Sequence, residues 1–316
     1  AYASAVKRLL AHGGFERTGD VAQAKKWDFE HITRWLDAHD RPDRRRTVHV
    51  AGSKGKGSVA SITAAILTAA SHSTGGGPTL LMTSPDLHSA RERIQVDGHP
   101  IDYREFADVA AVLLDDPDTA GWSYFEMLTV MGWIAGERAG CEWQVVEVGL
   151  GGRLDTTNAL AAKQVAVITP IDLEHVAILG DSIPAVAREK AGIITGPCDV
   201  VVEPMRASAI DVVRARTAEV GATLHEVTAE CAIRVLASGL DGQKLDLRTP
   251  VRTYRNLDVA LVGPYQVDNL VTAIRAAELA WQAAHGDAIP EADVREAMRR
   301  FRMPGRFEVV KQKPLV

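Results

Sequence analysis

The chain has 316 residues, of which 46% are hydrophobic and 24% charged, and its formal net charge is −5. This length predicts roughly two domains, and the composition is that of an ordinary globular protein. A negative net charge excludes a general electrostatic attraction to nucleic acid or to an anionic membrane surface. No apolar run is long enough to span a bilayer. We therefore expect neither a nucleic-acid partner nor a membrane partner.

Cysteine usage and the N-terminal residues bear on the cellular compartment. The cysteines, Cys141, Cys198 and Cys231, form no CxxC pair, so each is expected to be a small buried hydrophobe. An odd number of cysteines without a disulfide framework fits a reducing cytosol. The N-terminus lacks the basic-then-apolar pattern of a signal peptide. These features together predict a cytoplasmic protein.

Hydrophobic periodicity predicts that helices and strands alternate along the chain. Residues 1–46 are predicted to be mainly helical. Strands are predicted at 47–51, 79–83, 143–148, 165–169, 199–202 and 223–227. Helices are predicted at 59–70, 103–115, 125–139, 183–191, 206–219, 266–285 and 291–300, with a Ser/Gly-rich loop at 71–78. This alternation is typical of an α/β fold with a mostly parallel sheet flanked by helices, and shorter runs at 230–260 predict a small mixed or antiparallel β element.

The segment Gly52-Ser53-Lys54-Gly55-Lys56-Gly57-Ser58 lies between the first predicted strand and the helix that follows it. Its glycines let backbone amides close around an anion, and the N-terminus of the helix adds a partial positive charge. Lys56 can reach terminal phosphates, and the Ser58 hydroxyl can bind Mg²⁺. The spacing differs from that of the general P-loop, so a glycine-rich turn with two solvated lysines is the alternative.

Several polar residues follow other predicted strands, at the sheet edge where parallel α/β folds bind ligands. Ser84 follows the second strand, Glu147 ends the third, and His175 follows the fourth. Glu147 predicts a partner such as Mg²⁺ or its water, with a salt bridge to Arg153 as the alternative. His175 taken alone is predicted to be a hydrogen-bonded structural residue rather than a ligand.

Two further segments, taken alone, are explained by local structure without any function. The run Arg188-Glu189-Lys190-Ala191-Gly192 is typical of the solvated, charged end of a helix. The run Asp155-Thr156-Thr157-Asn158 consists of capping and turn residues.

Six segments nevertheless occur together in an order that is known from one protein family, and they extend over nearly the whole chain. They are Gly52 to Ser58, Thr83-Ser84-Pro85, Arg91-Glu92-Arg93-Ile94, Glu147-Val148-Gly149-Leu150-Gly151-Gly152-Arg153-Leu154-Asp155, Arg188 to Ile194, and Pro304-Gly305-Arg306. In these segments the chain resembles the folylpolyglutamate synthase/dihydrofolate synthase family, within the Mur ligase superfamily of ATP-dependent amide-forming ligases. The Glu147–Asp155 segment is highly specific.

The resemblance implies a Mur ligase central domain of P-loop type and an acid–amino acid ligase reaction. ATP would phosphorylate the carboxylate of dihydropteroate or of a tetrahydrofolate polyglutamate. The amine of L-glutamate would then attack the acyl phosphate, form an amide and release phosphate. Because charge builds on the transferring phosphoryl group, Mg²⁺ and lysine close to it are what this chemistry requires.

The resemblance also implies a function for individual residues. Nucleotide binding would involve Gly52, Ser53, Lys54, Gly55, Lys56, Gly57, Ser58, Asn269 and Arg306. A first Mg²⁺ would be held by Ser58, Ser84 and Glu147 and a second by His175, with Lys190 supporting the metal site. Lys56, His175 and Lys190 would be catalytic, with Lys190 carbamylated by CO₂, and Asp155 would contact the pterin.

The sequence departs from the family pattern in several places, among them the glycine-rich segment 71–78. The family commonly has His after Ser-Pro, where this chain has Asp86, and Asp-His where it has Glu174-His175. Family members also usually continue past Pro-Gly-Arg into a smaller C-terminal α/β domain. We therefore predict an ATP-binding domain at 1–303, followed at 304–316 by a linker and the start of a truncated C-terminal domain. The chain is expected to be a monomer.

Two other functions stay open on the sequence alone. A Mur-type ligase that acts on a cell-wall nucleotide precursor would usually carry an additional N-terminal domain, and only 46 residues precede the first predicted strand here. An ATP-binding fragment without ligase activity is favoured by the early end of the chain. It is disfavoured by the apparently complete set of metal-site residues.

Overall fold

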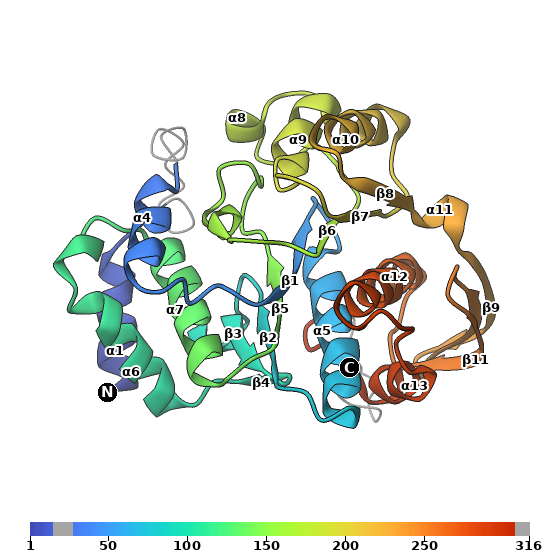
Figure 1. Cartoon of the computed structure of the whole chain (residues 1–316), viewed down its shortest axis with the longest axis horizontal. Helices are drawn as coiled ribbons and strands as arrows, with labels where there is room; N and C mark the ends of the chain where they lie inside the picture. Colours follow the sequence, from blue (N-terminus) through green and yellow to red (C-terminus); the bar gives the residue numbers. More distant parts are fainter. Residues whose placement is uncertain (15–27, 307–316) are drawn as a thin grey trace.

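The computed structural model describes residues 1–14 and 28–306, and an eight-stranded sheet runs through its centre (Figure 1). The strand order is β4-β3-β2-β5-β1-β6-β7-β8. The strands are β1 (Arg46–Ala51), β2 (Thr79–Met82), β3 (Ile94–Val96), β4 (His99–Pro100), β5 (Trp143–Glu147), β6 (Val165–Ile168), β7 (Asp199–Val202) and β8 (Thr223–Glu226). Neighbouring strands from β2 to β8 pair in parallel, whereas β3 and β4 add an antiparallel edge. The predicted α/β fold with a mostly parallel sheet is confirmed.

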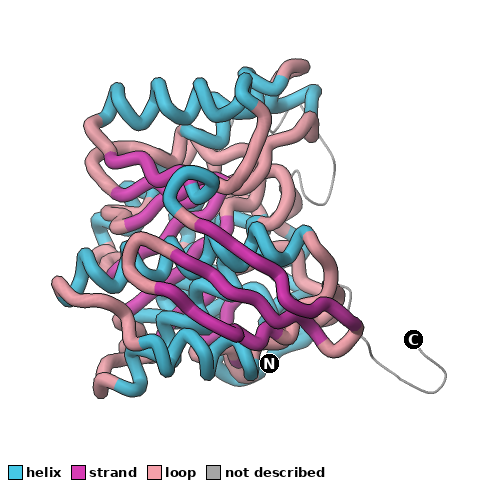
Figure 2. The backbone as a smooth tube through the Cα atoms, turned by 90° about the vertical axis from the view of Figure 1, so that its right-hand side faces the viewer, coloured by secondary structure: helices cyan, strands magenta, loops and turns pink. Residues whose placement is uncertain are grey.

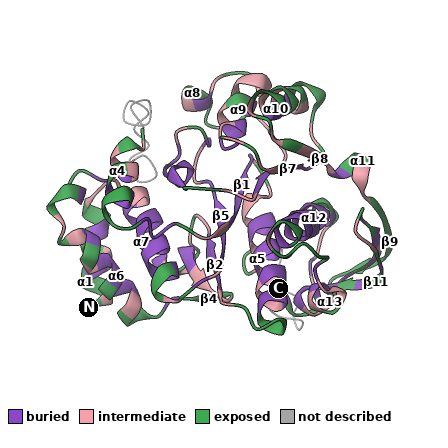
Figure 3. Cartoon of the chain, in the orientation of Figure 1, coloured by how far each residue is buried: buried purple, intermediate pink, exposed green. Residues whose placement is uncertain are grey.

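Helices cover both faces of the sheet and so produce three layers. One face is covered by α5 (Lys56–Ser73), α12 (Tyr265–His285) and α13 (Glu291–Arg300). The other face is covered by α1 (Tyr2–Ala11), α4 (Glu30–Ala38), α6 (Tyr103–Leu114), α7 (Tyr124–Arg138), α9 (Ile183–Ala191) and α10 (Ala207–Val220). Figure 3 shows that the central strands β1, β2 and β5 are buried between these layers.

Strand β1 contributes buried side chains to both faces of the sheet. Its side chains alternate, so Val48 and Val50 enter the core beside α5 while His49 points to the opposite face. All three side chains are fully buried. A strand that is covered on both faces reads as a nearly continuous apolar run, which is why β1 could be predicted within one residue of its bounds.

A second, three-stranded antiparallel sheet packs beside α12 and α13 (Figure 2). It consists of β9 (Ala232–Gly239), β10 (Gly242–Arg248) and β11 (Thr253–Val259), in the order β11-β10-β9. Leu245 and Tyr254 are fully buried against the helices, whereas β9 is exposed along its length. The β element predicted at 230–260 is therefore confirmed, and it is antiparallel.

The structure differs from the predicted elements in two places: no strands were predicted for the β3–β4 hairpin, and helix α5 is longer than predicted. Because α5 runs from Lys56 to Ser73, the loop predicted at 71–78 is shorter. Within this loop, Ser71 Oγ donates to the carbonyl oxygen of Gly77 at 2.7 Å. The short elements are η1 (Ala90–Arg93), η2 (Pro117–Thr119), η3 (Thr156–Ala159), α8 (Val176–Leu179) and α11 (Val227–Glu230).

Two predictions fall partly on residues that the structure does not describe. Residues 15–27, inside the predicted helical region 1–46, and residues 307–316, inside the predicted linker, lie outside the described residues. The division at 303/304 therefore stays a prediction. Within residues 1–14 and 28–306, no helix combines the length and the apolar character needed to cross a bilayer.

Candidate active site

The phosphate loop joins β1 to α5, and two of its positions accept only glycine. Gly52 has a φ of 150°, and a Cβ atom there would lie 1.8 Å from Oγ1 of Thr169. Gly55 has a φ of 87°, and its Cβ would lie 2.3 Å from Oδ1 of Asn269. The amide of Ser53 donates to the carbonyl of Pro170 at 2.9 Å. The loop is thus held between the segment after β6 and the first turns of α12.

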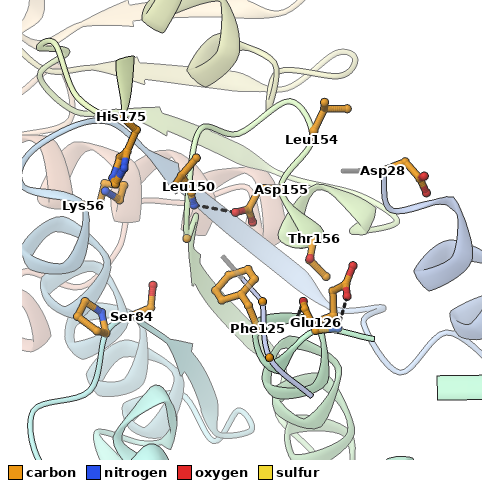
Figure 4. Close-up of a pocket in the computed structure, with 15 residues that line it drawn as sticks. Asp28, Lys56, Ser84, Phe125, Glu126, Leu150, Leu154, Asp155, Thr156 and His175 are labelled. Atoms are coloured by element: carbon orange, nitrogen blue, oxygen red, sulfur yellow. Dashed lines mark hydrogen bonds between the residues drawn. The ribbon is translucent and has the colours of Figure 1, made fainter. Parts of the chain in front are cut away.

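The two lysines of the loop have different surroundings. Lys54 is 75% exposed, and its ammonium donates to Asp172 at 3.0 Å. Lys56 opens α5 and lines a cavity together with Ser84 and His175. Figure 4 shows the side chains of Lys56 and His175 on the same side of the cavity. Lys54 therefore fits the alternative of a solvated lysine, whereas Lys56 is half-buried and lines the cavity.

Glu147 ends β5 with a buried carboxylate that faces the phosphate loop. Its Oε2 accepts a hydrogen bond from the amide of Ser84 at 2.9 Å and lies 3.4 Å from where a Cβ on Gly57 would be. Burial raises the pKa of Glu147 to about 6, against the opposing effect of nearby cations. The alternative salt bridge with Arg153 is wrong, because Arg153 pairs with Glu189 at 3.0 Å.

Three cations lie close enough to Glu147 to lower its pKa, namely Lys56, Arg306 and Arg93. The Arg93 guanidinium also donates to Asp86 at 2.5 Å. Asp86 is the residue that stands where the family commonly has His, and an ion pair accommodates this departure. Arg306, the last described residue, reaches the same site from the opposite end of the chain.

Lys190 is buried in α9, with 1% of its surface exposed. Its ammonium donates to the carbonyl oxygen of Gly52 at 2.7 Å and to Glu174 at 2.5 Å. Burial lowers the pKa of Lys190 to about 8, although Glu174 acts in the opposite direction. The predicted solvated helix end is therefore wrong for Lys190, while Arg188 in the same run is exposed.

Asp155 caps the short helix η3 and is 5% exposed. One carboxylate oxygen accepts from the amide of Leu150 at 2.8 Å, and the other accepts from the Thr157 amide at 3.0 Å and hydroxyl at 2.5 Å. Burial raises the pKa of Asp155, and these hydrogen bonds oppose the rise. The predicted capping function of this segment is confirmed.

A cavity of ≈500 Å³ extends from the phosphate loop toward the N-terminus of α7 (Figure 4). Phe125, Leu150 and Leu154 contribute apolar surface, and Lys56, Asp155 and Glu126 contribute charge. The remaining lining residues are Gly13, Gly14, Asp28, Ser84, Pro85, Ser123, Gly149, Thr156 and His175. An apolar cavity with a few convergent polar groups is the usual form of a small-molecule site.

Sequence reasoning missed Phe125 and Glu126, which begin α7 at the wall of this cavity. Glu126 accepts a hydrogen bond from the Ser123 amide at 2.6 Å, and His31 lies 3.1 Å from its carboxylate. Ser123 and Glu126 form a capping box, a pattern that can be recognised in a sequence and marks where a helix begins. The helix predicted at 125–139 already places both residues at its start, but no local pattern places them at a cavity.

The donor set near the phosphate loop fits Mg²⁺ in its chemistry. Ser58 lies in the first turn of α5, Ser84 follows β2, and Glu147 ends β5. In the described parts of the chain, His, Cys, Asp and Glu side chains form no group of three or more that could hold a metal. A single carboxylate with hydroxyl oxygens is nevertheless suited to Mg²⁺, which takes its other ligands from water and substrate phosphates.

The fold and this strand-end site define a Mur-type ligase domain, and the sequence profile of the Mur ligase middle domain matches residues 50–277. Within that class, the chain belongs to the folylpolyglutamate synthase/dihydrofolate synthase family. The dihydrofolate synthase/folylpolyglutamate synthase of Mycobacterium tuberculosis is 34% identical over 306 residues, which cover 90% of this chain and 61% of the relative. The chain thus spans less than two thirds of this relative's length.

Two solved structures show the same similarity in three dimensions. M. tuberculosis folylpolyglutamate synthase complexed with ADP superimposes with a TM-score of 0.81 at 31% identity, over 98% of this chain and 69% of that chain. An FPGS–AMPPCP–folate complex superimposes with a TM-score of 0.87 at 28% identity, over 99% of this chain and 75% of that chain.

Proposed function

We propose that the chain supplies the nucleotide and acid sites of an ATP-dependent ligase that joins L-glutamate to a folate-type carboxylate. One observation carries this proposal: the phosphate loop opens directly into the ≈500 Å³ cavity, and Lys56 belongs to both. ATP and an organic acid could therefore meet at one point. The names of the relatives, and the AMPPCP and folate in one similar complex, support the same function.

In this proposal the amides and glycines from Gly52 to Ser58 surround the ATP phosphates. Lys56 neutralises charge on the terminal phosphates, because it lies at the boundary between the loop and the cavity. Asn269, which packs on Gly55, and Arg306, whose charge reaches Glu147, lie on the nucleotide side. Lys54 is assigned to the outer side of the loop, where it contacts Asp172.

The proposed reaction has two steps. A carboxylate oxygen of the acid attacks the γ-phosphorus of ATP, and the bond to the β–γ bridging oxygen breaks to release ADP. The neutral amine of L-glutamate then attacks the acyl carbon, phosphate leaves, and the amine nitrogen loses a proton as the amide forms. Phosphorylation comes first because a free carboxylate is a poor electrophile with a poor leaving group.

Mg²⁺ would supply charge neutralisation at the transferring phosphoryl group. Ser58, Ser84 and Glu147 are the proposed ligands of a first ion and His175 of a second, and Lys190 would support the metal site only in a carbamylated form. Glu147 suits this function because its buried carboxylate needs a cation close to it. Lys56 and Arg306 supply positive charge from this chain itself.

Carbamylation of Lys190 is a separate proposal. Its lowered pKa of about 8 raises the fraction of neutral amine, the form that attacks CO₂ and releases a proton. The carbamate would lie beside Glu174, so two anions would need a cation between them. A ¹³C carbamate resonance that appears with labelled bicarbonate and Mg²⁺, and is absent in Lys190→Arg, would support it. An unmodified lysine under these conditions would refute it.

The proposed acid is dihydropteroate or a tetrahydrofolate polyglutamate. The cavity wall offers a flat aromatic ring, Phe125, and two carboxylates, Asp155 and Glu126. A flat heterocycle whose edge carries N–H donors could stack on the ring and donate to a carboxylate. A pterin has both properties, and this is the reason why Asp155 remains a proposed substrate contact.

ATP-dependent phosphate release by this chain tests the proposal. Release that requires both L-glutamate and one of the two acids would establish the ligase, and the ratio of the rates would rank the acids. An alternative is an ATP-binding unit that does not turn over alone, since the chain spans 61% of its M. tuberculosis relative. Tight Mg·ATP binding without phosphate release would favour that alternative. Absence of binding to ATP and to both acids would overturn the proposal.

A further inference from the structure

His49 is a fully buried histidine in the strand that leads into the phosphate loop, and nothing in the proposed reaction uses it. It lies three residues before Gly52 and points away from Val48 and Val50, toward the loop that follows β5. Its Nε2 lies 2.8 Å from Oγ1 of Thr157. A buried imidazole needs a partner for its N–H, and here that partner, Thr157, is bonded in turn to the cavity-lining residue Asp155.

The donor direction along this contact follows from the next hydrogen bond. Oγ1 of Thr157 lies 2.5 Å from a carboxylate oxygen of Asp155, so the hydroxyl proton is donated to Asp155. The hydroxyl oxygen must then accept from His49, which places a proton on Nε2. Nδ1 has no hydrogen-bond partner in residues 1–14 and 28–306, as expected for the unprotonated nitrogen of this tautomer. Burial lowers the pKa of His49 well below its ordinary value, in agreement with a neutral ring.

The chain of hydrogen bonds ends at the cavity wall. Asp155 accepts from Thr157 with one oxygen and from the amide of Leu150 with the other, at 2.8 Å. Asp155 and Leu150 both line the cavity, and Figure 4 shows the bond between them. A single path of directed hydrogen bonds thus leads from the interior of β1 to the surface where the acid is proposed to bind. We call His49, Thr157 and Asp155 the β1 relay.

We propose that His49 is a positioning residue for the acid substrate: through Thr157 it fixes the orientation of Asp155 and of the Leu150 backbone at the cavity wall. The inference rests on the proposed function, because it assumes that this cavity takes the folate-type acid. Thr157 has one hydroxyl proton, and a neutral His49 that donates from Nε2 forces this proton toward Asp155. Without His49 the hydroxyl loses its fixed donor and Asp155 loses part of its restraint.

The test compares variants that break the relay with variants that keep it. His49→Leu removes the donor, and Thr157→Val removes the hydroxyl. His49→Gln keeps an N–H donor on a side chain of similar reach, and Thr157→Ser keeps the hydroxyl. Thr47→Val is the matched control, because Thr47 lies in the same strand, is fully buried and bonds Arg45 and Gln144 instead.

Three quantities are measured for each variant: the Kd for dihydropteroate, the Kd for AMPPCP and the melting temperature. We expect His49→Leu and Thr157→Val to weaken dihydropteroate binding about tenfold while AMPPCP binding changes less than twofold. His49→Gln and Thr157→Ser should bind dihydropteroate within about threefold of the wild type. Thr47→Val should lower the melting temperature without changing either Kd.

The result that would overturn the relay is dihydropteroate binding that is unchanged in folded His49→Leu and Thr157→Val. If His49→Leu does not fold, Thr157→Val alone decides, because it lies outside the sheet. Wild-type protein that binds AMPPCP but no folate-type acid would favour the ATP-binding alternative over the proposed ligase. Amide hydrogen exchange at Leu150 and Thr157 then decides the relay: faster exchange in the relay variants than in Thr47→Val supports it, and equal exchange overturns it.

Discussion

The ammonium of Lys190 lies 2.7 Å from the carbonyl oxygen of Gly52, so helix α9 holds the first glycine of the phosphate loop in place. On the face of Gly52 where a Cβ would be, the side chain of Thr169 fills the space. The same ammonium is paired with Glu174, in the segment that also carries His175. One buried cation therefore joins the phosphate loop to the segment that follows β6.

Replacing Lys190 with Met should loosen the loop and leave Glu174 without its buried partner. We expect nucleotide affinity to fall at least about tenfold and the protein to be destabilised by roughly 2–4 kcal/mol. Arg188→Met is the matched control, because Arg188 lies one half-turn earlier in the same helix and is exposed. Calorimetric AMPPCP titration and thermal unfolding of both variants provide the measurement. Equal behaviour of the two variants would contradict this account of Lys190.

The two lysines of the phosphate loop should differ sharply when each is replaced with Ala. Lys56→Ala removes the cation that lies at the cavity, and we expect loss of phosphate release and about a hundredfold weaker Mg·ATP binding. Lys54→Ala removes an exposed ion pair with Asp172, for which a change of less than about threefold is expected. The two Kd values measured side by side distinguish the residues. A larger loss in Lys54→Ala would mean that their functions are reversed.

Glycine at position 52 is required by space as well as by backbone angle. Gly75 provides a comparison, because it also has a positive φ of 79° but nothing lies within 4 Å of its Cβ position. Gly75→Ala should cost about 1 kcal/mol of stability, whereas Gly52→Ala should cost more than about 3 kcal/mol or prevent folding. Urea unfolding gives both numbers. Similar losses at the two positions would show that contact with Thr169 is unimportant.

Glu203, which follows β7, makes stability depend on pH. Burial first, and then the charge of Asp268, raise the pKa of Glu203 from 4.5 to about 8. The folded state thus binds a proton that the unfolded state has lost between about pH 4.5 and 8, so stability falls as pH rises through this window. Glu203→Gln should remove this fall and be more stable than the wild type at pH 8.5, by on the order of 2–4 kcal/mol.

The wild type and the Glu203→Gln variant should differ little in stability at pH 4.5, where Glu203 is largely protonated in the folded state. Glu219→Gln on α10 is the control, since its side chain is 68% exposed and forms a surface ion pair with Arg216. Unfolding curves between pH 4.5 and 8.5 check this prediction. A wild type and a Glu203→Gln variant with parallel pH profiles would rule out the assigned burial effect.

Much of the fold could be predicted from the sequence, because the local hydrophobic patterns match the faces that are buried in the structure. The bounds of α9, α13 and β7 were predicted without error, since each is a short amphipathic or largely apolar run between turn residues. The β3–β4 hairpin was not predicted, because its strands have three and two residues and carry little pattern. Helix α5 begins three residues before the predicted position 59, because the last residues of the phosphate loop form the first turn of the helix.

The limits at the site have a different cause. Residues that follow strands could be predicted to meet, because parallel strands end at one edge of a sheet. The burial of Lys190 could not, because the local run of charges is the same whether a helix end faces solvent or the core. The partners of Asp86, Lys190 and His49 lie 7, 16 and 108 residues away in the sequence, respectively, and no local pattern contains the two longer separations.

The two faces of the large sheet carry different parts of the site. Helix α5 and its phosphate loop lie on one face, while Phe125, Glu126 and the capped Asp155 segment come from the other. If the proposed function holds, substitutions at the start of α7 should therefore alter acid binding without disturbing nucleotide binding. In the proposed ligase, acid specificity could thus change through one face of the sheet while the phosphate loop on the other face stays the same, and strand β1, which carries both His49 and the start of the loop, belongs to both parts.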